Sequence, residues 1–296
     1  MALKFPKGIF IDMKTYNDIY LNTRTVLRQR GIEAFNQEAR YIVAAASGKT
    51  VAELLKDMNL YASNRIEEKV TDYTARRLRG EPVAYITGSW EFYGLPIITN
   101  PDVLIPRVDT EVLVDTAVEF LMGKKMDARI LDLCCGSGCI TCALGHELPA
   151  ARLVSIDISA NALEVCRQNA AANRVISKVI CMQADALASP PLGIGEFDMI
   201  VSNPPYIPTG EIAKLDGSVR DYEPVWALDG GADGLKFYKA IIKYWKSLLK
   251  VGGYLIFEVG EGQAEAVLEM LDSAGFESTG IRQDTRGIDR VVWGKL

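Results

Sequence analysis

The sequence predicts an α/β fold, in which a mostly parallel sheet is covered by helices on both faces and a small helical module precedes it. Beyond Ala128, short apolar segments alternate with helical segments, whereas the first 80 residues show only helical periodicity. An aromatic stretch broken by glycine and proline separates the two regions. We therefore expect a helical domain (residues 1–80), a β-hairpin linker (81–106) and a sheet domain (107–296).

The helical domain is predicted from apolar residues spaced three or four apart. One such face comprises Tyr16, Ile19, Tyr20, Thr23 and Leu27, and a second comprises Phe35, Ala39, Ile42, Val43 and Ala46. Thr50 can cap a short helix, and Asn64 with Glu67 has the spacing of a capping box. We expect this domain to pack and to dock a partner, without catalytic residues.

The linker is expected to form a β-hairpin from residues 81–88 and 90–94, because both segments are aromatic and bounded by glycine. Residues 103–105, bracketed by prolines, predict a short strand, and a helix is expected to begin at Asp109 or Thr110. The sheet domain should then supply further strands at residues 129–133, 152–156, 178–182, 197–201, 254–259 and 291–293. Helices are expected between them, at residues 139–148, 160–173, 235–249 and 262–274.

Charge is distributed unevenly along the chain. The net charge is −5, but residues 1–80 carry 14 Lys and Arg against 9 Asp and Glu, and the remainder carries 19 against 29. An acidic sheet domain counts against stable nucleic-acid binding, which usually needs a basic surface. With no signal peptide and no apolar run of about 20 residues, we expect a cytoplasmic protein without membrane contact.

The six cysteines all lie between residues 134 and 181, in a segment with an apolar pattern. Free cysteines of this kind are usually buried and reduced. The cysteines have no paired spacing and no histidine companions, so the sequence predicts no metal site.

A glycine turn follows the strand predicted at residues 129–133, and it consists of Cys134, Cys135, Gly136, Ser137 and Gly138. Ligands bind at this edge of parallel sheets, although a glycine turn can also be an ordinary tight turn. Asp157 ends the next strand, where a carboxylate can accept from both ribose hydroxyls. Asp185 follows the third strand and can accept from an adenine amino group, while Ala186 offers a backbone donor. Together, the three strand ends predict an adenosyl-binding site.

This arrangement resembles the class I S-adenosylmethionine methyltransferases, which implies a Rossmann-like sheet of seven strands. The resemblance also implies S-adenosyl-L-methionine as cofactor and S-adenosyl-L-homocysteine as product. Cys134 stands where these enzymes usually have glycine, which makes Gly136 and Gly138 the most promising residues of the turn.

The segment Asn203-Pro204-Pro205-Tyr206 follows the fourth strand. Two prolines remove backbone donors and fix φ. The Asn203 side-chain oxygen and the Pro204 carbonyl can then accept from one planar NH2 group, with Tyr206 against its plane. We expect Asn203, Pro204 and Tyr206 to be catalytic, Pro205 to help bind the substrate, and Asn203 also to border the cofactor. An ordinary loop of this sequence is the alternative.

Further blocks resemble the release factor glutamine methyltransferases, the HemK or PrmC family. They are residues 79–88, 91–94, 104–107, 221–238, 257–260 and 290–292. Val108 departs from the family, which usually has proline there. The resemblance implies N5-methylation of the glutamine in the Gly-Gly-Gln motif of class 1 peptide chain release factors, with the helical domain docking the substrate.

Other functions remain open at this point. The Asn-Pro-Pro-Tyr segment also occurs in nucleic-acid methyltransferases that modify adenine N6 or guanine N2, although no recognition domain for a flipped base is visible. A glutamine methyltransferase acting on a ribosomal protein is a second alternative. A non-catalytic adaptor is a third, but it would have no use for Asn203 together with Tyr206. We expect a monomer.

Overall fold

The computed structural model describes residues 14–123, 125 and 127–296. The chain divides into two compact units, one ending at Thr87 and the other running from Gly88 to Leu296. We call them the helical unit and the sheet unit and describe each separately.

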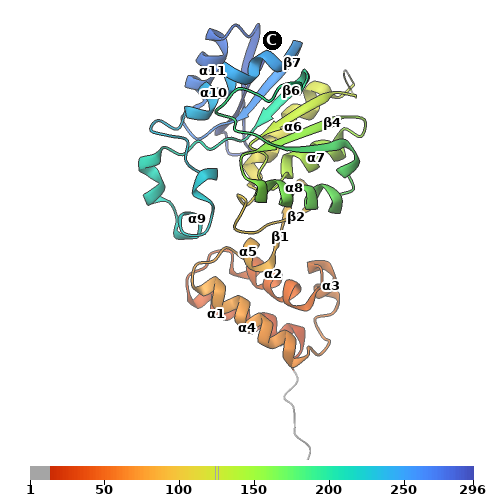
Figure 1. Ribbon diagram of the computed structural model, residues 1–296. Coiled ribbons are helices and arrows are strands. Elements are labelled where there is room, and N and C mark those ends of the chain that lie inside the picture. The colour runs from red at the N-terminus through yellow and green to blue at the C-terminus, as the bar shows by residue number, and fades with distance from the viewer. Residues whose placement is uncertain (1–13, 124, 126) are drawn as a thin grey trace, which may run out of the picture. The chain divides into compact units, whose positions relative to one another are not determined.

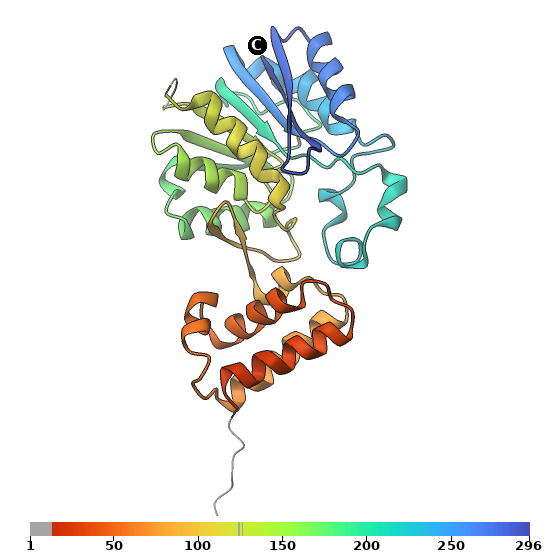
Figure 2. The same cartoon turned by 180° about the vertical axis from the view of Figure 1, so that it is seen from behind.

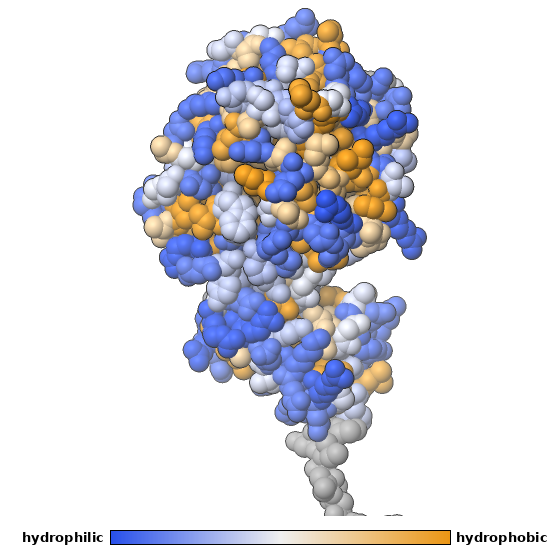
Figure 3. All heavy atoms as spheres, viewed as in Figure 1, coloured by the Kyte–Doolittle hydropathy of each residue, from blue (hydrophilic) through white to orange (hydrophobic). Residues whose placement is uncertain are grey.

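The helical unit consists of short helices that bury one face each. They are α1 (Tyr16–Gln29), α2 (Phe35–Ser47), α3 (Val51–Lys56), α4 (Asn64–Leu78) and α5 (Val83–Thr87). The buried residues of α1 are the five predicted from their spacing, while Phe35 of α2 is only partly buried. An ion pair of 2.6 Å between Arg77 of α4 and Glu38 of α2 joins two of these helices. The face of this unit seen in Figure 3 is mostly hydrophilic, as expected of amphipathic helices.

The two predicted caps have different outcomes. Thr50 caps α3 as expected, because its hydroxyl accepts from the Glu53 backbone N–H at 3.2 Å and the Glu53 carboxylate bonds back to Thr50. The capping box expected at Asn64 is wrong. Ser63 has the extended backbone of a cap residue, and Asn64 is already the first residue of α4.

The linker differs from the predicted hairpin in its first half. Residues 83–87 form the helix α5, begun at Pro82, whose carbonyl accepts from the Tyr85 and Ile86 backbone N–H groups. The hairpin comes after it, from β1 (Ser89–Phe92) and β2 (Leu95–Ile98). Tyr93 and Gly94 form its turn with φ of 52° and 69°, as a two-residue hairpin of the I′ type requires. The strand expected at residues 103–105 is also wrong. Val103 and Ile105 are buried, but the segment forms no strand.

A seven-stranded sheet forms the centre of the sheet unit, as the α/β prediction required. Its order is β5-β4-β3-β6-β7-β9-β8, and only the pairings of β9 with β7 and β8 are antiparallel. The strands are β3 (Arg129–Leu133), β4 (Arg152–Asp157), β5 (Val179–Gln183), β6 (Phe197–Ser202), β7 (Leu249–Glu258), β8 (Ser278–Gln283) and β9 (Asp289–Lys295). The position of β8 was not predicted, since this edge strand is polar and has no fully buried residue.

Helices cover both faces of this sheet (Figures 1 and 2). On one face lie α6 (Glu111–Leu121), α7 (Cys139–Glu147) and α8 (Ala160–Ala172), and on the other lie α10 (Lys236–Trp245) and α11 (Ala264–Ser273). Strand alternation explains the two cores, because Met199 and Ile200 are neighbours in β6 but point to opposite faces. Within the part of the chain that the structure describes, no helix is long and apolar enough to cross a membrane.

Candidate active site

A cavity of about 300 Å³ opens at the carboxyl ends of the parallel strands β5, β4, β3 and β6. Ligands bind at this edge in open α/β sheets. The predicted site residues that line the cavity are Cys134, Gly136, Asp157, Asp185, Ala186, Asn203 and Pro205. They come from the ends of four different strands and the loops that follow them, so the sheet assembles residues that are up to 71 positions apart in sequence.

The glycine turn is held in place by Asp157. The Gly136 backbone N–H donates to Asp157 Oδ2 at 2.9 Å, and Ser159 N–H donates to Oδ1 at 2.9 Å. Burial raises the pKa of Asp157, and these backbone donors oppose the effect. A carboxylate has further acceptor positions, so Asp157 can hold the turn and still accept from a hydroxyl in the cavity.

Three residues of the predicted glycine turn do not line the cavity: Cys135, Ser137 and Gly138. They contribute to the structure of the turn instead. The Cys135 N–H donates to the Ile156 carbonyl of β4 at 3.0 Å. Gly138 precedes α7 with φ of 75°, and a Cβ at this position would lie 2.5 Å from Cys166 Sγ. Glycine is therefore required here by both the backbone conformation and the neighbouring side chain.

Asn169 of α8 is a supporting residue that the sequence analysis missed. Its side chain is fully buried and exchanges two hydrogen bonds with the Ile98 backbone of β2, at 2.7 and 3.0 Å. A third bond of 2.9 Å runs from its Nδ2 to the Ser137 carbonyl in the turn. One amide thus ties the hairpin to the glycine turn, and no sequence spacing signals that contact.

The cysteines near the turn are free thiols, and four of the six are buried. Burial raises the pKa of Cys142 to about 12, so this thiol stays protonated. No group of three or more metal-binding side chains gathers among the residues that the structure describes.

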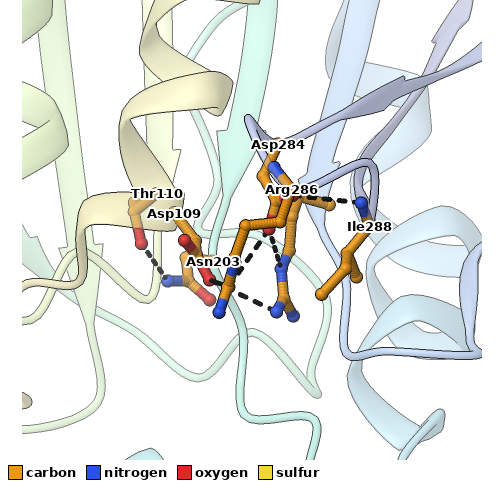
Figure 4. A network of polar contacts seen from close by, with 7 residues as sticks. Asp109, Thr110, Asn203, Asp284, Arg286 and Ile288 are labelled. Carbon is orange, nitrogen blue, oxygen red and sulfur yellow. Dashed lines mark hydrogen bonds and ion pairs between the residues drawn. The ribbon is translucent and has the colours of Figure 1, made fainter.

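Asn203 follows β6 directly, and its side chain has a defined orientation. Its Nδ2 donates to the Thr110 hydroxyl at 3.2 Å, so the carbonyl oxygen turns away from Thr110 (Figure 4). Pro204 and Pro205 are buried. Asn203 also lines the cavity, and its oxygen can therefore serve as an acceptor there.

The Tyr206 backbone accepts a hydrogen bond from a glutamine side chain and is closely approached by two glycines. Gln263 Nε2 donates to the Tyr206 carbonyl at 2.9 Å. A Cβ on Gly234 would lie 2.3 Å from that carbonyl oxygen, and a Cβ on Gly230 would lie 2.7 Å from Tyr206 Cα. Burial raises the pKa of the Tyr206 phenol, which stays neutral. The glycine-rich segment after residue 228 therefore lies directly against the acceptor segment.

Several cavity residues lie outside the predicted set: Asp102, Val103, Leu104, Trp226, Ala227, Lys236 and Phe237. They reach the cavity because two chain segments meet there. Glu223 accepts from the Ile105 N–H at 3.3 Å and pairs with Arg107 at 2.5 Å, which joins the segment before α6 to the segment near Trp226. Strand periodicity carries no signal for such loop contacts.

Two family models match the chain. A PrmC N-terminal domain model matches residues 18–88, and a methyltransferase small domain model matches residues 106–215. A release factor glutamine methyltransferase of Geobacter sulfurreducens is 40% identical over 93% of this chain and 94% of its own. One of Bradyrhizobium diazoefficiens is 39% identical over 90% of both chains.

The chain belongs to the release factor glutamine methyltransferase family. This result confirms the resemblance noted in the sequence. A solved methyltransferase from Pyrococcus furiosus has a TM-score of 0.52 at 18% identity, covering 76% of this chain and 98% of that one. This likeness concerns only the fold, and it agrees with the class I methyltransferase fold that the sequence predicted.

Proposed function

We propose that this protein methylates N5 of the glutamine in the Gly-Gly-Gln motif of class 1 peptide chain release factors, using S-adenosyl-L-methionine. The Asn203 carboxamide carries the proposal, because its nitrogen is engaged by Thr110 and its residue lines the cavity. Its carbonyl oxygen is left to accept from the NH2 of a substrate amide, which has donors only on that nitrogen.

The cavity residues suit the adenosyl cofactor. Asp157 would accept from the ribose hydroxyls, Asp185 from the adenine amino group, and the turn at Cys134 and Gly136 would lie beside the remaining part of the molecule. A bound S-adenosylmethionine would supply an electrophilic methyl group and leave as S-adenosylhomocysteine. As the new N–C bond forms and the C–S bond breaks, the glutamine nitrogen would release one of its two protons to water.

The residues of the chain would mainly align the acceptor. Asn203 and the Pro204 carbonyl would accept from both N–H groups of the glutamine amide, and Tyr206 would lie against its plane. This arrangement orients the nitrogen lone pair toward the methyl group. Positioning of this kind can lower a barrier by roughly 7–11 kcal/mol. The helical unit, matched by the PrmC N-terminal model, is proposed to dock the release factor.

Incubation with methyl-labelled S-adenosylmethionine tests the activity. We expect label in a purified release factor and none in a version whose Gly-Gly-Gln glutamine is replaced by alanine. Label in bare tRNA, DNA or a ribosomal protein, with none in the release factor, would contradict the proposed substrate.

A further inference from the structure

Glu258 is a buried carboxylate beside the acceptor segment. It ends β7 and is 2% exposed. Ser202 of β6 pairs with Phe257 of β7 in parallel register, so Asn203, the residue after β6, lies beside Glu258, the last residue of β7. One oxygen of Glu258, Oε2, has no hydrogen-bond partner among the residues that the structure describes. Burying an ionised carboxylate costs folding free energy, which suggests that Glu258 has a functional role.

Three polar side chains from three elements meet at this point. Thr110, 2% exposed, lies at the start of α6, Asn203 follows β6, and Glu258 ends β7. Asn203 Nδ2 donates to the Thr110 hydroxyl. Burial raises the pKa of Glu258 to about 7, and hydrogen bonds from Thr110 and Asn203 oppose this rise. The Thr110 hydroxyl can accept from Asn203 while it donates to Glu258.

Thr110 is itself fixed by an ion-pair network. The preceding residue, Asp109, pairs with Arg286 at 2.7 Å and with Arg290 at 3.2 Å. Arg290 also pairs with Asp284 at 3.3 Å, which connects Asp109 to the turn between β8 and β9 (Figure 4). The segment that carries Thr110 is therefore fixed at one end by α6, which it precedes, and by the ion pairs of Asp109 with Arg286 and Arg290.

This arrangement selects one of the two orientations of the Asn203 carboxamide. An ionised carboxylate only accepts hydrogen bonds, so it favours the amide nitrogen and repels the amide oxygen. If the carboxamide turned over, its oxygen would face Glu258 and its NH2 would face the cavity. An NH2 group in that position would face the NH2 of a substrate amide. Because both groups are donors, no hydrogen bond could form between them.

We propose that Glu258 and Thr110 are positioning residues, which hold the nitrogen of Asn203 inward so that its carbonyl oxygen faces the substrate amide. This inference rests on the proposed function, since it specifies how the amide-binding group is oriented. Neither residue touches the substrate. Their effect passes through Asn203.

A crossed pair of substitutions at Thr110 separates positioning from packing. Thr110→Val keeps the shape and removes the hydroxyl, whereas Thr110→Ser keeps the hydroxyl and removes a methyl group. We expect Thr110→Val to lower kcat about 10- to 100-fold and Thr110→Ser to stay within a few-fold of wild type. The reverse order would show that Thr110 acts by packing and would overturn the proposal.

Thr116→Val is the matched control, because Thr116 is also buried on α6 and its hydroxyl donates to the Val112 carbonyl of the same helix at 2.7 Å, away from Asn203 and Glu258 in the sequence. It should keep kcat within about twofold. Calorimetric affinity for S-adenosylhomocysteine should change little in each variant, which verifies that the sheet unit is folded.

Glu258→Gln tests the orientation directly, because a glutamine can donate as well as accept and therefore tolerates the turned-over Asn203. We expect kcat to fall about 10- to 100-fold with little change in cofactor affinity. Wild-type kcat should also fall as the pH drops through about 7, and Glu258→Gln should lack this step. Arg290, Asp109, Tyr206 and Tyr238 also face Glu258, but they remain in the variant.

A measurement without substrate keeps the inference separate from the proposed activity. The side-chain amide protons of Asn203, assigned by their loss in Asn203→Ala, should exchange with solvent more slowly than those of the exposed Asn36. Glu258→Gln and Thr110→Val should speed that exchange. Fast exchange in the wild-type protein overturns the inference whatever the activity, whereas slow exchange with no glutamine methylation refutes only the proposed function.

Discussion

At the scale of single residues, the chemistry depends on which end of one carboxamide faces the cavity. Asn203 lines the cavity with its nitrogen bonded to Thr110, so its expected role is to accept from the substrate rather than to hold the cofactor. Truncation separates these roles, because alanine removes the acceptor oxygen and leaves Asp157 and the glycine turn unchanged.

We therefore predict that Asn203→Ala reduces kcat by at least about 10²-fold, while the calorimetric Kd for S-adenosylhomocysteine changes less than about threefold. A large loss of cofactor affinity would instead assign Asn203 mainly to the cofactor site.

Gly234 offers a second prediction at this scale. Gly234 and Gly262 both have positive φ, but a Cβ would meet the Tyr206 carbonyl at 2.3 Å in the first case and nothing within 4 Å in the second. Alanine at either position should cost about 1–2 kcal/mol of backbone strain. Only Gly234→Ala should also displace Tyr206 and lower kcat about tenfold or more. Equal kcat in the two variants would show that the close approach of this glycine is irrelevant to activity.

At the scale of elements, Asn169 couples the β1–β2 hairpin to the glycine turn through α8. Its three hydrogen bonds, of which the one to Ser137 is buried, reach Ile98 and Ser137, which lie in segments far apart in the sequence. The geometry of the turn therefore depends on a helix that contributes little of the cavity wall.

We predict that Asn169→Ala lowers the unfolding free energy by about 2–3 kcal/mol, because it leaves the buried Ser137 carbonyl and the partly buried Ile98 backbone groups unpaired. It should also weaken cofactor binding. Asn173→Ala is the control, since Asn173 bonds the hairpin at the Pro96 carbonyl but does not reach the turn. Denaturant unfolding and calorimetry on both variants measure the effects, and equal loss of cofactor affinity in the two would argue against the coupling.

At the scale of the whole molecule, buried carboxyl groups make stability depend on pH. Asp132 of β3 is fully buried beneath the turn, and burial raises its pKa from 3.8 to about 7 although Thr141 donates to it. Because the folded pKa lies above the unfolded one, the unfolded chain binds fewer protons between these values. Asp132 therefore lowers stability progressively as the pH rises from about 4 to about 7.

Comparison with Asp132→Asn isolates this contribution from the other titrating groups. The variant stays neutral at position 132. Its unfolding free energy minus that of wild type should therefore increase by at most about 1.4 kcal/mol per pH unit over that range. Denaturant unfolding at pH 5, 6, 7 and 8 measures the difference. A difference that stays constant with pH would mean that Asp132 titrates normally in the folded protein.

The sequence alone was enough for the α/β class and most of the strands and helices, because alternation and helical spacing depend only on neighbours along the chain. Local patterns failed in two places. Residues 83–87 are β-prone but form a helix after Pro82, and the polar strand β8 has no apolar alternation by which it could be predicted. Asp157, Asp185 and Asn203 could be nominated because parallel strands end at a common edge.

Only the tertiary structure decided which groups surround those residues. Asn169, Glu258 and the segment near Trp226 reach the site from elements distant in sequence. The orientation of the Asn203 carboxamide follows from such neighbours. A sequence pattern records the type of residue and its spacing, whereas a hydrogen bond between two side chains depends on their separation in space, which the packing of α6, β6 and β7 sets.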